Sequence, residues 1–212
     1  MKNLKNRRTK ERGVALVEFG LCLSLFWMPL FLGTVVIGYS LIQAIQVTQV
    51  CRDAGHMYAF GTDFSTTSNK YLLASLGSGL NIDPSGAGGN SVVILSTITY
   101  VDDVTCPNGQ APGGKSCGNY QHTVFSKWIV VGNSALHQSA FQSSSTPPTT
   151  DSSGNVTNYW DAPAARVVGF SPSVLPLTSS SQLAYVSELY DHSSSPLSTF
   201  LGNPWVASRS VF

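Results

Sequence analysis

The feature that most constrains the fold is a long stretch near the N-terminus without a charged side chain. After Glu18, the chain contains no Asp, Glu, Lys or Arg until Arg52. The strongly apolar region around this stretch, from Val14 to about Val47, greatly exceeds the roughly 20 residues that a helix needs to cross a bilayer. The glycines and the proline inside it are tolerated in membrane helices, where neighbouring groups re-satisfy the backbone. The stretch therefore predicts a membrane-spanning helix.

The distribution of charge predicts the orientation of this helix. Residues 1–13 hold six basic side chains and one acidic one, a net charge of +5, whereas the rest of the chain holds six basic and ten acidic side chains, a net charge of −4. A basic tail beside a membrane segment stays in the cytoplasm, so everything after about residue 45 is expected outside. Basic residues confined to a tail do not form the basic face of a nucleic-acid-binding domain, and no nucleic-acid partner is expected.

The helix is predicted to continue beyond the membrane to about residue 60, where Gly61 is a stop signal. Residues at steps of three or four form one stripe along this second part, which is expected to pack against another element. The members of the stripe are Leu41, Ile45, Thr48, Cys51, Gly55 and Tyr58.

The remaining sequence predicts a small domain in which hairpins join the strands. A short helix is expected within 68–79, capped by Ser68 and ended by Gly77. Runs rich in β-branched and aromatic residues predict strands at 91–101, 122–131, 183–192 and 203–212. The tract 138–158, rich in Ser, Thr and Pro, predicts an exposed loop.

These elements define a fold class and a domain organisation. We predict an α+β protein in which a long N-terminal transmembrane and amphipathic helix precedes a small, mostly antiparallel β-sheet domain. The three parts are a basic leader at 1–13, the helix at 14–60 and an extracytoplasmic domain at 61–212.

Two of the four cysteines are predicted to form a disulfide. Cys106 and Cys117 flank a polar loop rich in Gly and Pro between the first two predicted strands, and a disulfide persists outside the cytoplasm. A zinc site would need CxxC or histidine partners at ligand spacing, which the sequence lacks. Cys22 and Cys51 lie in the predicted helix and are interpreted as packing residues.

The N-terminal segment allows three interpretations. A cleaved secretory signal peptide would have an apolar region of about 7–15 residues, far shorter than the one present, and would not contain Glu18. A plain membrane anchor explains the length and the flanking charges, but treats Glu18 only as a tolerated residue at the membrane edge. A third interpretation uses the whole motif "RGVALVEF" at residues 12–19.

This motif resembles the processing site of the type IV pilin superfamily, in which a basic leader and a Gly precede a mature chain with Glu at its fifth position. The run "RGVALVEFGLCLSLF" looks most like the TadE family of minor pilin-like proteins from tight-adherence, Flp-type pilus systems. The stretch "QVTQVCRDAGHMYA" and the ending "YVSELYDH…WVASRSVF" also resemble that family. The resemblance implies cleavage by a prepilin peptidase after Gly13, with Val14 as the new N-terminus.

The resemblance also implies a role and partners for the mature protein. Glu18 would pair with the Val14 ammonium of a neighbouring subunit and set the stagger between subunits, because an unpaired carboxylate at that depth is costly. An intramolecular pair with its own Val14, about one helical turn away, is the alternative. The expected partners are the bacterial inner membrane, the prepilin peptidase and other pilin-like subunits of the tight-adherence apparatus.

The sequence contains no recognisable catalytic or cofactor motif. The four histidines are scattered, and there is no HExxH, no phosphate-binding GxxxxGK[ST] and no GxSxG, so no cofactor, metal or catalytic residue is expected. Asp102 and Asp103 are interpreted as solvated acids of a hairpin turn. The competing function classes are a structural pilin-like subunit, a membrane-anchored extracytoplasmic enzyme or binding module, and a type II secretion pseudopilin.

Overall fold

The computed structural model describes residues 3–111, 113–169, 176–192 and 205–212. The chain divides into two compact units, residues 1–42 and residues 43–212. The helix α1, Asn3–Ala59, contributes to both of them. It begins before the helix predicted from residue 14 and ends within one residue of the predicted end.

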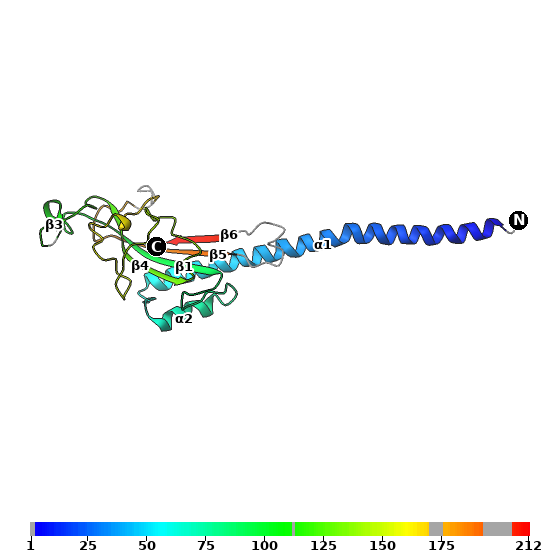
Figure 1. Cartoon of the computed structure of the whole chain (residues 1–212), viewed down its shortest axis with the longest axis horizontal. Helices are drawn as coiled ribbons and strands as arrows, with labels where there is room; N and C mark the ends of the chain where they lie inside the picture. The colour runs from blue at the N-terminus through cyan, green and yellow to red at the C-terminus, as the bar shows by residue number, and fades with distance from the viewer. Residues whose placement is uncertain (1–2, 112, 170–175, 193–204) are drawn as a thin grey trace. The chain divides into compact units, whose positions relative to one another are not determined.

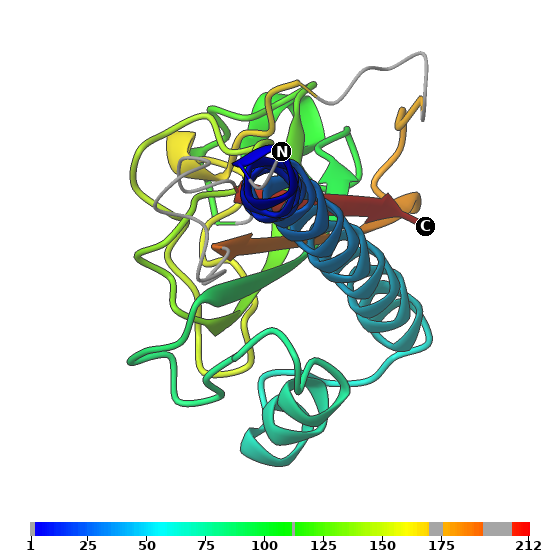
Figure 2. The same cartoon turned by 90° about the vertical axis from the view of Figure 1, so that its right-hand side faces the viewer.

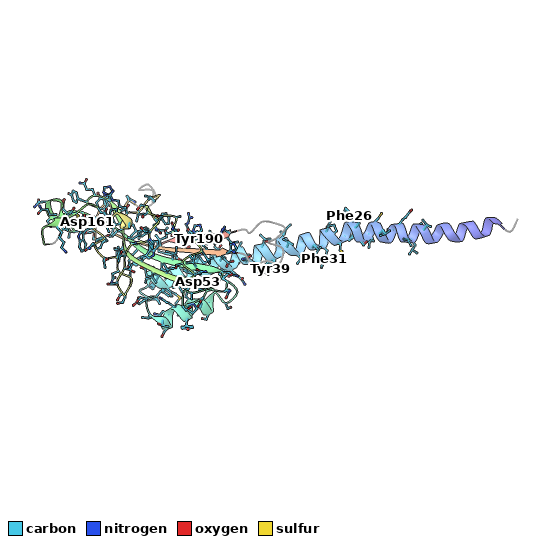
Figure 3. All side chains as sticks on the ribbon, viewed as in Figure 1. Phe26, Phe31, Tyr39, Asp53, Asp161 and Tyr190 are labelled. Carbon is cyan, nitrogen blue, oxygen red and sulfur yellow. A yellow bond between two sulfur atoms is a disulfide. The ribbon has the colours of Figure 1, made fainter. Side chains whose placement is uncertain are left out.

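The first unit is the N-terminal part of α1, and its apolar side chains point outward all around the helix. Phe26, Phe31 and Tyr39 are exposed and project from the ribbon in Figure 3. The hydroxyl groups in this part donate to carbonyls of the preceding turn, as Ser24 does to Leu21 at 3.0 Å. Polar side chains that bond within their own helix need no outside partner, so this part of α1 suits an apolar surrounding.

The second unit is built on a four-stranded antiparallel sheet (Figure 1). The strand order is β4-β1-β5-β6, and every neighbouring pair is antiparallel. The strands are β1 at Ser91–Tyr100, β4 at Thr123–Gly132, β5 at Leu183–His192 and β6 at Trp205–Val211. The smaller elements are α2 at Thr67–Leu76, β2 at Gln110–Ala111, β3 at Lys115–Ser116 and two 3₁₀ turns at Pro107–Gly109 and Pro163–Ala165. The predicted α+β class is confirmed.

The sheet is covered on both faces, so its central strands β1 and β5 are buried on both sides, whereas β6 at the edge is partly exposed. One face carries Val93, Leu95 and Leu189, which pack with the C-terminal part of α1, drawn in cyan in Figure 2. The other face carries Ile98 and Phe125 in a second cluster that the loops cover. As a result, β1 is buried at every position but Tyr100, its polar residues included.

The face of α1 that packs on the sheet agrees with the predicted stripe only in its second half. Cys51, Gly55 and Tyr58 are buried as predicted, whereas Leu41, Ile45 and Thr48 are exposed, which corrects the first half of the prediction. The buried positions are Val47, Val50, Cys51, Ala54, Gly55 and Tyr58.

Close approach between helix and sheet selects this face. A Cβ added to Gly55 would lie 2.3 Å from the Phe212 ring and 3.0 Å from the Ser187 Cβ. The Cys51 thiol donates to the Ser187 carbonyl at 3.3 Å. Small residues on both sides therefore allow this part of α1 to lie directly on β5 and β6.

The end of α1 is a Schellman motif, with Gly61 in the left-handed conformation at φ +91°. The Gly61 amide donates to Tyr58 at 3.0 Å, and the Thr62 amide donates to Met57 at 2.9 Å. The predicted stop at Gly61 is thus confirmed. For α2, the predicted end at Gly77 is confirmed, but the N-cap is Thr66 and not Ser68.

The tract 138–158 is mostly exposed, as predicted, but part of it packs against the sheet. Ser139, Gly154 and Val156 are buried. The Trp128 amide donates to the Gly154 carbonyl at 2.7 Å, and the Val156 amide donates to the Ser126 carbonyl at 2.9 Å. The loop therefore satisfies backbone groups along the outer edge of β4, which would otherwise be open to pairing with another chain.

Candidate functional site: the N-terminal segment and the disulfide hairpin

The predicted processing residues lie within one uninterrupted helix. α1 runs through Gly13, Val14 and Glu18 without a break. Val14 and Glu18 are both exposed, and four residues of helix correspond to a rise of about 6 Å. Among the residues that the structure describes, none forms an ion pair with Glu18. The carboxylate is therefore presented on the helix surface about one turn from the predicted new N-terminus.

The described residues contain one helix long and apolar enough to cross a membrane. The candidate span is Val14–Ala59, with a mean hydropathy of 2.1 in its most apolar window and no part of that window buried. The exposure of this window distinguishes it from the core helix of a soluble protein, and agrees with a single-pass membrane anchor.

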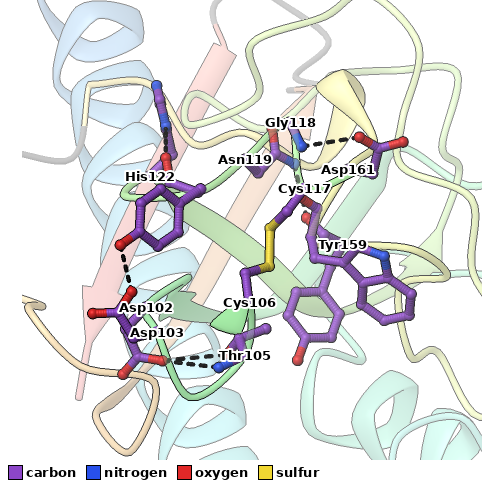
Figure 4. Close-up of a disulfide and its surroundings, with 12 residues drawn as sticks. Asp102, Asp103, Thr105, Cys106, Cys117, Gly118, Asn119, His122, Tyr159 and Asp161 are labelled. Carbon is purple, nitrogen blue, oxygen red and sulfur yellow. Dashed lines mark hydrogen bonds between the residues drawn. A yellow bond between two sulfur atoms is a disulfide. The ribbon is translucent and has the colours of Figure 1, made fainter. Parts of the chain in front are cut away.

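The predicted disulfide is present and closes the tip of the β1–β4 hairpin (Figure 4). Cys106 and Cys117 are joined with a Cα–Cα distance of 6.4 Å. Cys106 is fully buried. The disulfide therefore belongs to the sheet's loop-covered core and does not lie in a free surface loop.

The acidic pair beside the disulfide is more constrained than the predicted solvated turn. Asp102 is half-buried and accepts hydrogen bonds from the amides of Val104 at 3.0 Å and Ser180 at 2.7 Å. These bonds, the Ser180 amide foremost, hold the pKa of Asp102 well below its usual range. Asp103 accepts from the Tyr120 hydroxyl at 2.5 Å. Asp102 thus ties the segment around Ser180 to the hairpin.

Replacing both Cys106 and Cys117 with Ser is expected to destabilise the second unit by about 3 kcal/mol, because the closed loop no longer restricts the unfolded chain. Urea unfolding of the oxidised protein and of the double variant, followed by tryptophan fluorescence, measures the difference. Cys22→Ser is the matched control, since Cys22 is an exposed free thiol. Equal midpoints for the double variant and the control would contradict the prediction.

A buried ionic cluster lies on the loop-covered face of the sheet, and sequence reasoning missed it. Glu188 on β5 is completely buried, and its Oε1 lies 3.1 Å from the Arg209 Nε on β6. The Tyr190 hydroxyl at 2.8 Å and the Ala140 amide at 3.1 Å donate to the same oxygen. Burial and the nearby Glu188 raise the pKa of Tyr190 to about 12. The cluster links β5, β6 and the loop at 140.

The histidines mainly make packing contacts. His56 lies 4.4 Å from the Phe212 ring, and His137 stacks on Tyr190 at 3.8 Å between ring centroids. Among the residues that the structure describes, no group of three or more His, Cys, Asp or Glu side chains could hold a metal ion. Of the three tryptophans in the second unit, Trp128 is buried, Trp160 is half-buried and Trp205 is exposed.

Comparisons with known proteins place the family match on the N-terminal segment. The family model described as "TadE-like protein" matches residues 13–56, which include Gly13, Val14, Glu18 and most of the α1 face that packs on the sheet. No curated protein and no solved structure matches the chain. Over residues 13–56, the chain is thus similar to the TadE-like protein family.

Proposed function

We propose that the protein is a TadE-like minor pilin or pseudopilin, a non-enzymatic structural or assembly component of a Flp-type pilus or a related secretion system. The observation that carries the proposal is the position of Gly13, Val14 and Glu18 at the start of an exposed apolar helix, within the segment that matches the family. In this proposal, the leader stays in the cytoplasm, the apolar part of α1 spans the inner membrane and residues 43–212 lie in the periplasm or outside the cell.

The chemistry at the N-terminus supports an assembly role. Cleavage after Gly13 creates an ammonium on Val14 at nearly the depth of the Glu18 carboxylate. Each charge is costly in an apolar surrounding and is stabilised by the other. Pairing between neighbouring subunits would fix their axial stagger, while the exposed apolar side chains of α1 pack against neighbouring helices and lipid.

Processing between Gly13 and Val14 is the expected result that tests this proposal. When the protein is expressed with its prepilin peptidase, intact-mass measurement and N-terminal sequencing of the membrane-extracted protein should show the loss of residues 1–13. Gly13→Leu should retain the leader, because the small residue before the cut is lost. Gly20→Leu is the matched control, since a Cβ at Gly20 meets no atom within 4 Å, and this variant should be processed normally.

The same experiment separates the alternatives. A chain that still begins at Met1 in the presence of the peptidase would contradict the proposal and favour a plain anchor for an extracytoplasmic binding module or enzyme. A chain cleaved well inside the apolar segment would indicate a secretory signal peptide. A type II secretion pseudopilin would show the same processing, so crosslinking to tight-adherence or to type II secretion subunits distinguishes these two systems.

A further inference from the structure

A pocket of about 330 Å³ lies where the end of α1 meets the sheet, and the proposed assembly role does not use it. Its volume is at the lower end of the roughly 300–1,000 Å³ that ligand pockets span. Several separate segments of the second unit converge on it: the end of α1 and the turn after it, β1, β4, β5 and the loop at 155. Because each wall of the pocket belongs to a different element, the groups that line the pocket are held in fixed positions relative to one another.

A β-bulge gives the pocket its polar wall. The β1–β4 register pairs Thr97 with Lys127 and Ile98 with Phe125, so Ser126 is an extra residue. A bulge of this kind breaks the alternation of side chains and re-aims them. As a result, the consecutive residues Ser126 and Lys127 both line the pocket. The loop holds the bulge in place, because the Ser126 carbonyl accepts the Val156 amide at 2.9 Å.

The opposite wall is aromatic and apolar. The Tyr58 ring is buried, and its hydroxyl shares a hydrogen bond of 2.7 Å with Thr97. Burial raises the pKa of Tyr58 to about 12, so its hydroxyl stays protonated. Tyr185 meets Tyr58 edge-on at 5.6 Å between ring centroids, and the Leu183 side chain beside it is 46% exposed. This wall offers an apolar surface that a ligand can cover.

The charges at the rim argue against an anion. The Lys127 ammonium lies 3.6 Å from the Asp63 carboxylate, and both side chains are partly exposed. Hydrogen bonds from Ser65 lower the pKa of Asp63, and hydrogen bonds from Asn155 lower the pKa of Asp151, with a smaller contribution from Lys127 in each case. Both carboxylates are therefore charged at neutral pH. One ammonium beside two carboxylates leaves no net positive charge to attract a phosphate or a carboxylate.

We propose that this pocket binds a neutral saccharide of one or two rings. A pair of ring hydroxyls can donate a hydrogen bond to Asp63 and accept one from Lys127. The two residues therefore favour a ligand that both donates and accepts hydrogen bonds. The less polar face of the ring packs on Tyr185 and Leu183, since binding sites combine apolar walls with a few placed polar groups. The chain thus carries a glycan-binding site on the domain that would lie outside the membrane.

Saturation-transfer NMR on the full chain tests the proposal, with the protein in phosphocholine micelles so that no sugar headgroup competes. The probes are glucose, galactose, N-acetylglucosamine and lactose, with inorganic phosphate as the anionic probe. At least one sugar should bind saturably with a Kd below about 10 mM, and phosphate should not compete. If none of the sugars binds, or if phosphate binds in a Lys127-dependent way, the proposal is overturned.

Variants locate the binding. Lys127→Gln and Asp63→Asn should each weaken sugar binding about tenfold, the effect of losing one charged hydrogen bond. Lys115→Gln and Asp53→Asn, exposed residues outside the pocket, are the matched controls. The amide oxygen that D63N introduces can still accept from the Ser65 amide, so this variant should fold, and far-UV circular dichroism and the intact disulfide verify this. Sugar binding that D63N and the controls retain equally would overturn the assignment to this pocket.

Discussion

Replacing Glu18 with Gln should abolish association with neighbouring pilin-like subunits while the protein remains inserted and processed. Gln keeps the shape and polarity of the side chain but removes the charge that would attract the Val14 ammonium of a neighbour. The unpaired ammonium is then left in an apolar surrounding, at a cost of about 3–5 kcal/mol where the pair is deeply buried. Crosslinking in membranes, followed by immunoblotting for subunit adducts, measures the effect.

The controls for this experiment follow from the structure of α1. Insertion should survive because the apolar helix contributes far more transfer free energy than one residue at its edge. Processing should survive because Gly13 is unchanged. Gln49→Glu is a suitable control, because Gln49 is exposed. Gln43→Glu is not suitable, since Gln43 donates a hydrogen bond to Asp191. If E18Q assembles as well as the parent, Glu18 is only a tolerated interfacial carboxylate.

The largest loss of folding stability is expected from Arg209→Met. This change leaves the Glu188 carboxylate completely buried without its cation. Removing one partner of a fully buried ion pair costs about 3–5 kcal/mol. Because the Arg209 side chain is itself 46% exposed, the loss is expected at the lower end of this range, which is still a large share of the roughly 5–15 kcal/mol that stabilises a typical domain. Urea unfolding of the full chain in micelles, followed by tryptophan fluorescence, gives the change in the free energy of unfolding.

A second substitution shows whether the buried charge is the cause. In the double variant R209M with E188Q, the amide oxygen still accepts from Tyr190 and Ala140, but no charge is left unpaired. We expect this variant to recover more than half of the lost stability. Arg52→Met, on the exposed side of α1, is the control and should change the free energy by less than about 0.5 kcal/mol. A double variant no more stable than R209M would show that packing by Arg209, and not its charge, holds β6.

Local patterns in the sequence were sufficient for the long apolar helix, the strands and the disulfide. β1 was predicted at 91–101 and lies at Ser91–Tyr100, and β5 was predicted at 183–192 and lies at Leu183–His192. The motif at Gly13 and Glu18, on which the proposed processing rests, was also visible, since its residues lie close together in the chain. In each case, the physical signal arises from neighbours in sequence: unbroken hydropathy, β-branched runs, or two cysteines flanking one turn.

The features that depend on distant segments were decided by the tertiary structure. Periodicity showed that α1 beyond the membrane has a packing face, but steps of three and four fit more than one face. The close approach of Gly55 to Phe212 and Ser187 selected the face. No local pattern joins Glu188 to Arg209, because that ion pair forms only when β5 and β6 align. The bulge at Ser126 likewise required the register between β1 and β4. The sequence by itself thus determined the long apolar helix, the order of the elements and the disulfide. The register between strands and the packing of helix on sheet determined the buried charge, the helix face and the pocket, since side chains far apart in the chain meet only in the folded domain.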